Sequence, residues 1–538
     1  MSRSVVFMVA CAAALAAPSA PAAQPCGSLA NLTLANNTTI TLASPVAAGQ
    51  FTPPDGAAVT VPAFCRVSGV SRPTADSEIK FEVWLPDAWN ARFDQGGNGG
   101  YGRGFNVPGG FMVGALNRGY AVAGTDMGHP RTFGYDATWA VGHPEKLIDW
   151  AYRANHVTAQ SAKAIIRAFY GDGPRFSYFT GCSDGGHEAL MEAQRFPDDF
   201  DGIVGGALAN NWTRQSAGHI WQARALLDAG MTASKLSLVA RASVPACDGV
   251  DGLVDGLIED PRRCSFDPVA LQCGGADAPD CLTAAQVDAV RKNYAGPRNP
   301  RTGELLYPGV ERGGEALWTF VLPPTPGGIG LPFYRELVFE NPSWNINMLD
   351  YDRDVAFGDA KMGPIINSTD PDLRDFRSLG GKFIMYHGWS DQAINPRNSI
   401  DYLNSVIEFL ARHDRHDRGR GRLAKAEREA SDFIRLFMVP SMPHCGGGPG
   451  VNTFDALTAL QRWVEQGIAP DTIIASNAGL GLGPNVMSAA PGTLTRPLCA
   501  YPKLARWTGK GSTSDAANFR CVKPEKADRD DDGRDDDR

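Results

Sequence analysis

The sharpest chemical signal in the chain is the segment Thr180-Gly181-Cys182-Ser183-Asp184-Gly185-Gly186. It follows an apolar run and precedes a helical pattern, as does the G-x-S-x-G turn that presents a nucleophilic serine between a strand and a helix. Glycines flank such a serine because the strained turn leaves no room for side chains beside it. The motif predicts Ser183 as a nucleophile, and a glycine-rich turn with an ordinary serine is the alternative from this segment alone.

A serine of this kind needs an acid and then a histidine further along the chain. Asp391 and His444 each follow an apolar run, in that order. In the predicted relay His444 takes the proton of Ser183, while Asp391 orients the imidazole and stabilises its charged form. His387 is the competing histidine, and its position before the acid indicates a structural role.

Two cysteines flank these residues, because Cys182 immediately precedes the serine and Cys445 immediately follows the histidine. A disulfide between them would tie two distant loops together and hold nucleophile and base in register. In the chain-entropy description, a bond that closes so long a loop adds roughly 4–5 kcal/mol of stability. The alternative is two unrelated structural cysteines.

The elements that must position these residues are apolar runs that alternate with helical patterns. Strands are expected at 81–85, 120–123, 176–180, 202–205, 383–386 and 433–439, and helices at 187–196 and 454–466. Such alternation favours a mainly parallel sheet covered on both faces. Together with the serine motif it predicts the α/β class.

The length of 538 residues exceeds what one hydrophobic core usually supports, so a catalytic domain with an insertion is expected. The strand and helix alternation breaks in a stretch that holds four cysteines and a proline-rich run, which we interpret as a lid. A highly charged stretch contains His413 and His416, which indicates a solvated surface rather than metal ligands. The expected divisions are 24–209 and 352–522 for the catalytic domain, 210–351 for the lid, and 523–538 for a charged, disordered tail.

The N-terminus has the pattern of an export signal, with Arg3, a short apolar run from 5 to 17, and small residues at 20–23. Residues 1–23 are therefore expected to be a signal peptide. A lipoprotein cleavage site at Cys11 is the alternative, but too little apolar sequence precedes it. The run is too short to span a bilayer, and no later stretch of about 18 or more apolar residues occurs. We therefore expect a secreted or periplasmic protein without a membrane partner.

The formal net charge of −8 lacks the basic footprint that nucleic-acid-binding proteins usually carry. Nucleic acid is therefore not an expected partner. The sequence does not specify an oligomeric state.

Eleven cysteines occur, and ten are left once Cys11 leaves with the signal peptide. An even set in an exported protein suggests disulfides. Spacing alone does not decide their connectivity. Sequence order suggests four local bridges, which leave Cys182 and Cys445 as a long-range pair: Cys26–Cys65, Cys247–Cys264, Cys273–Cys281 and Cys499–Cys521.

The pairing of Cys-Ser with His-Cys, with an acid between them, resembles the tannase and feruloyl esterase family, which includes mono(2-hydroxyethyl) terephthalate hydrolases. The resemblance runs from Cys26 to about Cys521. It implies an α/β-hydrolase fold with a large inserted lid, and a serine carboxylic ester hydrolase that works through an acyl-enzyme. The segments that carry it are 181–186, Arg195-Phe196-Pro197, Tyr386-His387-Gly388 and 443–450.

Two backbone amides are expected to hold the oxyanion. One belongs to Asp184, directly after the nucleophile. The resemblance implies the other in the glycine-rich segment 95–101, where we assign Gly99, with Gly100 as the alternative. A phosphate-binding loop is the rival interpretation, but this segment lacks the lysine of a G-x-x-x-x-G-K-[ST] loop.

Three aspartates separated by turn glycines supply the hard oxygen ligands that calcium prefers: Asp248, Asp251 and Asp255. The resemblance implies a structural Ca²⁺ site in the lid, with Leu253 and Leu257 as carbonyl donors. A bridge between Cys247 and Cys264 would clasp this loop. A solvated acidic turn is the alternative.

The resemblance implies a small-molecule aromatic ester as substrate. The lid segment 333–344 favours feruloyl or related hydroxycinnamoyl esters, followed by the gallate esters of tannases and then a terephthalate half-ester. Arg335 does not clearly match the arginine that holds a free carboxylate in the terephthalate enzymes. A calcium-stabilised protein that binds aromatic ligands without catalysis is the non-enzyme alternative.

Overall fold

A computed structural model of the protein describes residues 24–131, 135–413, 421–477 and 493–524. The expected signal peptide, His416 and residues 525–538 of the expected tail lie outside the described residues. No helix in the described ranges is long and apolar enough to cross a membrane.

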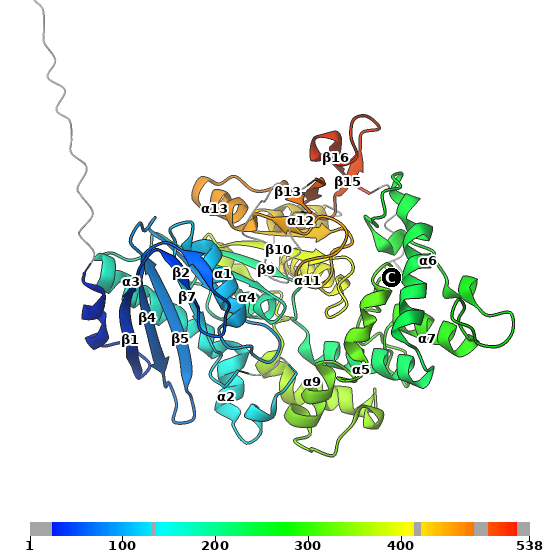
Figure 1. The fold of residues 1–538 in the computed structure, drawn as a ribbon, viewed down its shortest axis with the longest axis horizontal. Helices are drawn as coiled ribbons and strands as arrows, with labels where there is room; N and C mark the ends of the chain where they lie inside the picture. Colours follow the sequence, from blue (N-terminus) through cyan, green and yellow to red (C-terminus); the bar gives the residue numbers. More distant parts are fainter. Residues whose placement is uncertain (1–23, 132–134, 414–420, 478–492, 525–538) are drawn as a thin grey trace, which may run out of the picture.

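The centre of the molecule is a nine-stranded sheet with the order β1-β4-β5-β7-β6-β8-β9-β10-β11. From β7 to β11 in this order the neighbouring strands are parallel, whereas β1, β4 and β5 are antiparallel to their neighbours. The strand bounds are Thr38–Val46, Phe64–Ser71, Ile79–Pro86, Arg92–Gly96, Ala121–Thr125, Phe176–Cys182, Gly202–Gly206, Lys382–Gly388 and Ile434–Val439 for β1, β4, β5, β6, β7, β8, β9, β10 and β11. Figure 1 shows the N-terminal strands β1, β4 and β5 side by side, in blue.

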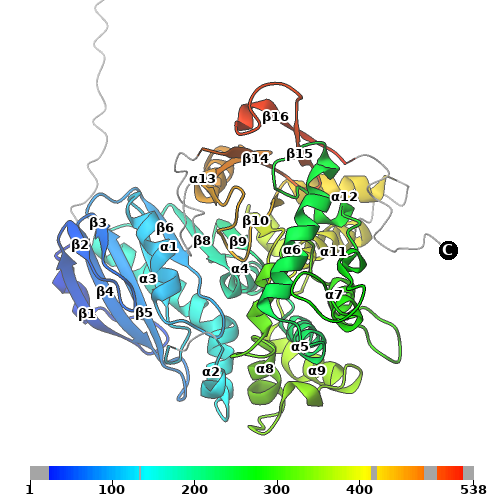
Figure 2. The same ribbon diagram turned by 45° about the vertical axis from the view of Figure 1, so that its right-hand side comes forward.

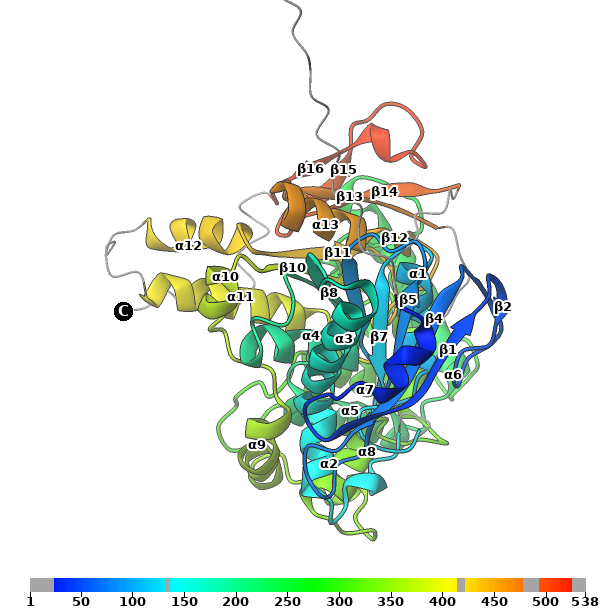
Figure 3. The same ribbon diagram turned by 90° about the vertical axis from the view of Figure 1, so that its left-hand side faces the viewer.

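Helices cover both faces of the parallel part of this sheet. On one face lie α1 (Asn106–Leu116) and α13 (Ala456–Gln466), and on the other lie α3 (Ala154–Tyr170), α4 (Asp184–Arg195) and α11 (Arg397–His413). Neighbouring strand residues alternate between the two cores, since Tyr178 packs in the first and Phe179 in the second. Figure 3 shows α11 beside α12 (Arg422–Ser431), next to the edge strand β11.

Smaller sheets lie outside this core. A three-stranded sheet contains β12 (Thr453–Phe454), β13 (Thr472–Ser476) and β14 (Thr495–Cys499), and two-stranded pairs join β15 (Leu504–Trp507) to β16 (Phe519–Val522) and β2 (Gly49–Phe51) to β3 (Val59–Val61). The segment after β14 pairs with the edge strand through a bridge between Phe437 and Ala500. This contact covers part of an otherwise open sheet edge.

The chain between β9 and β10 is mainly helical and adds no strand to the nine-stranded sheet within the part that the structure describes. Figure 2 shows its helices α5, α6 and α7, in green, on the side of the molecule away from β1. The helices α5 and α9 pack together, so the helical layer continues past residue 351, the expected end of the lid. Its helices are α5 (Trp212–Asp228), α6 (Ala233–Asp248), α7 (Ala284–Ala295), α8 (Gly330–Pro332) and α9 (Arg353–Ile366).

Five disulfides join cysteines of the described residues, and they are the five pairs that sequence order suggests. Four close local loops, namely Cys26–Cys65, Cys247–Cys264, Cys273–Cys281 and Cys499–Cys521. The fifth joins Cys182 to Cys445, which are 263 residues apart in the sequence. The expected connectivity is confirmed.

Candidate active site

Ser183 lies on the turn between β8 and α4. Its backbone adopts φ 70° and ψ −121°, a conformation that costs a non-glycine residue free energy and that marks a tight, strained turn. A Cβ on Gly181 would clash with the backbone of Gly185. The glycines around the serine are therefore required by close backbone approach, which is the reason the sequence motif implies.

His444 follows β11 and meets the serine directly. Its Nε2 lies 2.8 Å from the Ser183 Oγ, and its Nδ1 lies 2.8 Å from Oδ2 of Asp391. A carboxylate only accepts hydrogen bonds, so Nδ1 carries the proton and Nε2 is free to accept the serine hydroxyl. The structure thus brings the three predicted residues into one hydrogen-bonded relay.

Asp391 follows β10 and is buried. Its Oδ1 accepts the backbone amides of Ala393 at 2.8 Å and Ile394 at 2.9 Å, and its Oδ2 also lies 3.1 Å from Nε2 of His387. Burial by itself raises the pKa of the Asp391 carboxyl, but the charge of His444 and hydrogen bonds from His387 and His444 hold that pKa well below its usual range. The carboxyl is therefore ionised at neutral pH.

The disulfide between Cys182 and Cys445 connects the residues next to the predicted nucleophile and base, with their Cα atoms 6.0 Å apart. Cys445 itself has a φ of 61°, and Gly447 and Gly448 after it also have positive φ. The loop that carries His444 therefore forms neither helix nor strand. A covalent bond to the end of β8 fixes its position.

The two predicted oxyanion amides lie on neighbouring segments. The amide of Gly185 donates to the carbonyl of Asn98 at 3.0 Å, which holds the glycine-rich segment against the start of α4. The Gly99 amide donates to Oδ1 of Asn98 at 2.9 Å. Among the described residues, neither the Asp184 amide nor the Gly100 amide has a hydrogen-bond partner.

The residues that support this segment were not predicted from the sequence. The carboxyl group of Glu188, buried in α4, accepts the amide of Asn98 at 2.9 Å. A Cβ on Gly97 would lie 2.8 Å from Oε2 of that carboxyl group and 2.9 Å from Cα of Gly185. No motif announces such a contact, because a glutamate in a helix gives no signal of a partner on a distant loop.

The predicted calcium ligands lie at the last residue of α6 and in the segment that follows it: Asp248, then Asp251, Leu253, Asp255 and Leu257. Each aspartate accepts a backbone amide of the same loop. Burial and the charges of Asp255 and Asp248 raise the pKa of Asp251, against a lowering hydrogen bond from the Leu253 amide. The donor set therefore has the oxygen chemistry and the excess negative charge that suit a calcium ion.

One feature of the loop competes with a metal ion. The guanidinium of Arg496, almost fully buried, pairs with Asp255. In the described ranges no three His, Cys, Asp or Glu side chains converge into a metal-binding group. The loop thus contains the expected ligand types without an assembled coordination shell.

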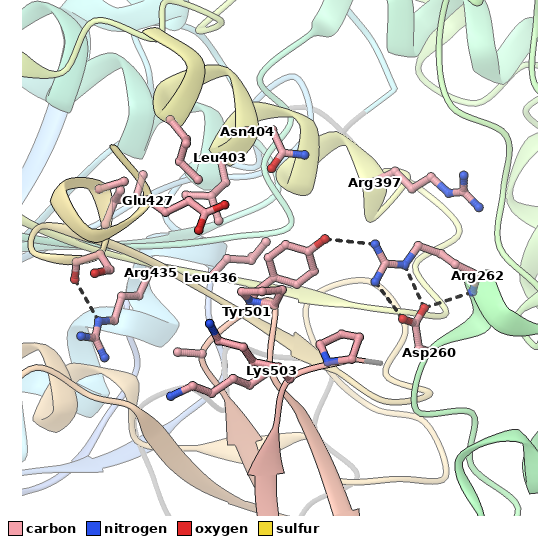
Figure 4. Close-up of a pocket in the computed structure, with 18 of the residues that line it drawn as sticks. Asp260, Arg262, Arg397, Leu403, Asn404, Glu427, Arg435, Leu436, Tyr501 and Lys503 are labelled. Carbon is pink, nitrogen blue, oxygen red and sulfur yellow. Dashed lines mark hydrogen bonds and ion pairs between the residues drawn. The ribbon is translucent and has the colours of Figure 1, made fainter. Parts of the chain in front are cut away.

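A groove with a cavity volume of about 1070 Å³ lies along the edge strand β11, between α11, α12 and the segment around Tyr501. Figure 4 shows Arg262 between Asp260 and Tyr501, to both of which it donates hydrogen bonds. The groove lining contains none of the predicted site residues. It is a separate feature from the relay.

Comparison with known proteins adds three findings. The family described as tannase and feruloyl esterase matches residues 65–522. An uncharacterized esterase of Xanthomonas campestris pv. campestris is 40% identical, over 94% of this chain and 92% of its own, and the mono(2-hydroxyethyl) terephthalate hydrolase of Piscinibacter sakaiensis is 33% identical, over 88% and 87%. The crystal structure of feruloyl esterase B from Aspergillus oryzae matches with a TM-score of 0.81 and 30% identity, covering 92% of this chain and 99% of that one. The predicted α/β-hydrolase fold is confirmed.

Proposed function

Because this chain belongs to the tannase and feruloyl esterase family and is a carboxylic ester hydrolase, we propose that it cleaves esters with Ser183 as nucleophile, His444 as base and Asp391 as acid. The observation that carries the proposal is the continuous relay from the Ser183 Oγ through the imidazole to the Asp391 carboxylate. The nature of the protein as an esterase leaves the non-catalytic binding alternative without support.

Catalysis proceeds by acyl transfer. The Ser183 Oγ attacks the ester carbonyl while His444 Nε2 takes its proton, and the oxyanion is held by the Asp184 amide and an amide of the Gly99–Gly100 segment. The protonated imidazole then gives the proton to the leaving alcohol, which leaves an acyl-serine. Water, activated by the same histidine, releases the acid and restores the serine.

We further propose that the acyl group is aromatic, of the hydroxycinnamoyl or feruloyl type. The likeness to feruloyl esterase B supports this acyl group. Gallate esters are the first alternative, because the family includes tannases. A terephthalate half-ester is the second, because the chain is also similar to a mono(2-hydroxyethyl) terephthalate hydrolase. The five disulfides among the described residues support export, because disulfides persist in oxidising compartments.

The test is hydrolysis of methyl ferulate, methyl gallate and a terephthalate half-ester by wild-type protein and by the Ser183→Ala variant. We expect turnover of one substrate by the wild type and a fall of at least about 10⁴-fold in kcat in the variant. Equal activity of both proteins would rule out Ser183 as the nucleophile. A preference for gallate or the half-ester would replace the proposed acyl group.

We propose a structural Ca²⁺ in the loop from Asp248 to Leu257, bound by the three carboxylates and the carbonyls of Leu253 and Leu257. A cation there would relieve the mutual repulsion of the aspartates. We expect CaCl2 added after EGTA treatment to raise the Tm of the wild type, since a ligand that binds only the folded state stabilises it. The Asp251→Asn variant should respond less, and MgCl2 should not replace calcium. An unchanged Tm in the wild type would contradict the site.

A further inference from the structure

His387 is a buried histidine whose ring contacts three polar groups at the end of β10. Its Nε2 lies 3.1 Å from Oδ2 of Asp391 and 3.1 Å from the carbonyl oxygen of Ile394. Its Nδ1 lies 2.7 Å from the hydroxyl of Ser399, at the start of α11. The side chains of His387 and Asp391 are both fully shielded from solvent.

These contacts determine the position of the ring proton. A carboxylate and a carbonyl are both acceptors, so Nε2 must be the donor to each of them. A neutral ring then has no proton on Nδ1, which accepts the hydroxyl proton of Ser399. In a neutral ring this tautomer satisfies all three contacts, and the two acceptors at Nε2 select it.

We propose that His387 is a positioning residue for the catalytic acid, with its Nε2–H holding Oδ2 of Asp391 in line with Nδ1 of His444. The inference rests on the proposed function, because it assigns His387 a role in the relay from Ser183. Asp391 then receives two imidazole donors on one oxygen and two backbone donors on the other. Four hydrogen bonds therefore fix the orientation of the carboxylate, and His444 supplies only one of them.

The second imidazole also sets how basic the acid is. Each hydrogen bond donated to a carboxylate favours its ionised form and weakens it as a base. Loss of the His387 donor would therefore raise the proton affinity of Asp391 and, through it, that of the His444 imidazole. The other titratable groups that interact electrostatically with Asp391 are His219 of α5, Tyr307 of the lid and Tyr386 of β10.

Two substitutions separate donation from packing. The amide nitrogen of glutamine reaches about as far as Nε2 of histidine, whereas that of asparagine reaches only about as far as Nδ1. His387→Gln therefore keeps a donor for Asp391, and His387→Asn loses it while keeping a polar group near Ser399. The matched control is His156→Asn in α3, because His156 pairs with Asp199 instead of a relay residue.

The experiment is the pH profile of kcat/KM for the full-length wild type and these three variants, with thermal unfolding as a check on folding. We expect His387→Asn to move the acid limb upward by about one pH unit and to lower kcat by about 10- to 100-fold, because the acid is both more basic and misaligned. His387→Gln should keep the acid limb and kcat close to their wild-type values, and His156→Asn should leave the acid limb where it is.

An acid limb that stays in place in a folded His387→Asn variant would overturn the positioning role and leave His387 as a packing residue. That result differs from a failure of the proposed function. If Ser183→Ala retained the wild-type activity, the relay itself would be wrong, whatever the His387 variants do.

Discussion

Cys182 and Cys445 form a disulfide, and each is the direct chain neighbour of a residue that shares the proton of the relay, Ser183 and His444 respectively. The bond therefore helps to set the geometry between the proposed nucleophile and the proposed base. It also closes a loop of 263 residues, the longest of the five disulfide-bonded loops.

Removing this bond should damage activity more than removing any local bridge. We expect the double variant Cys182→Ser with Cys445→Ser to lose roughly 4–5 kcal/mol of unfolding free energy and about 100-fold in kcat, because the His444 loop is released. The matched control is the double serine variant of Cys273 and Cys281, whose residues are only 8 apart. Urea unfolding and ester hydrolysis measure the two effects. Equal kcat in both double variants would show that the long-range bond does not align the relay.

Glu188 should make the protein less stable as the pH rises. Burial, together with the charge of Asp184, raises the pKa of its carboxyl to about 8, whereas a carboxyl of the unfolded chain titrates near about 4.3. Between these values the folded protein keeps a proton that the unfolded chain has lost, so the unfolding free energy falls with increasing pH.

The variant Glu188→Gln should therefore flatten this dependence by up to about 1.4 kcal/mol per pH unit, because glutamine cannot ionise and still offers an acceptor to the Asn98 amide. The measurement is urea unfolding at several pH values between about 5 and about 8. Glu427→Gln, at an exposed position of α12, is the control and should leave the slope unchanged. An unaltered slope in Glu188→Gln would mean that Glu188 titrates alike in both states.

Gly97 should tolerate no side chain. A Cβ there meets Glu188 and the backbone of Gly185, so Gly97→Ala must push the glycine-rich segment away from α4. We expect kcat to fall by about 10- to 100-fold with a smaller change in KM, since the oxyanion amides act mainly in the transition state. Gly27→Ala, where no atom lies within 4 Å of the added Cβ, is the control. Wild-type kcat in Gly97→Ala would exclude a role for this segment in oxyanion binding.

Features with a local signal could be predicted from the sequence. Neighbouring residues reveal the glycines that Ser183 requires and the apolar runs that precede Asp391 and His444. The even set of cysteines is likewise visible without any structure. The expected strands and the helix 454–466 follow the same logic. The helix after the serine begins at Asp184 and not at 187, because the turn itself initiates it and two glycines conceal its start.

The tertiary structure decided what depends on partners far apart in the chain. The strands β1, β4 and β6 were not predicted, because none of them has an apolar run like those of β10 and β11. Asn98 and Glu188 are 90 residues apart, and no spacing rule links them. The sequence alone predicted which residues form the proposed relay, since their types and local turns are encoded nearby. Only the folded chain decided how the acid and the oxyanion segment are held, since hydrogen bonds form between whichever groups the fold brings within about 3 Å.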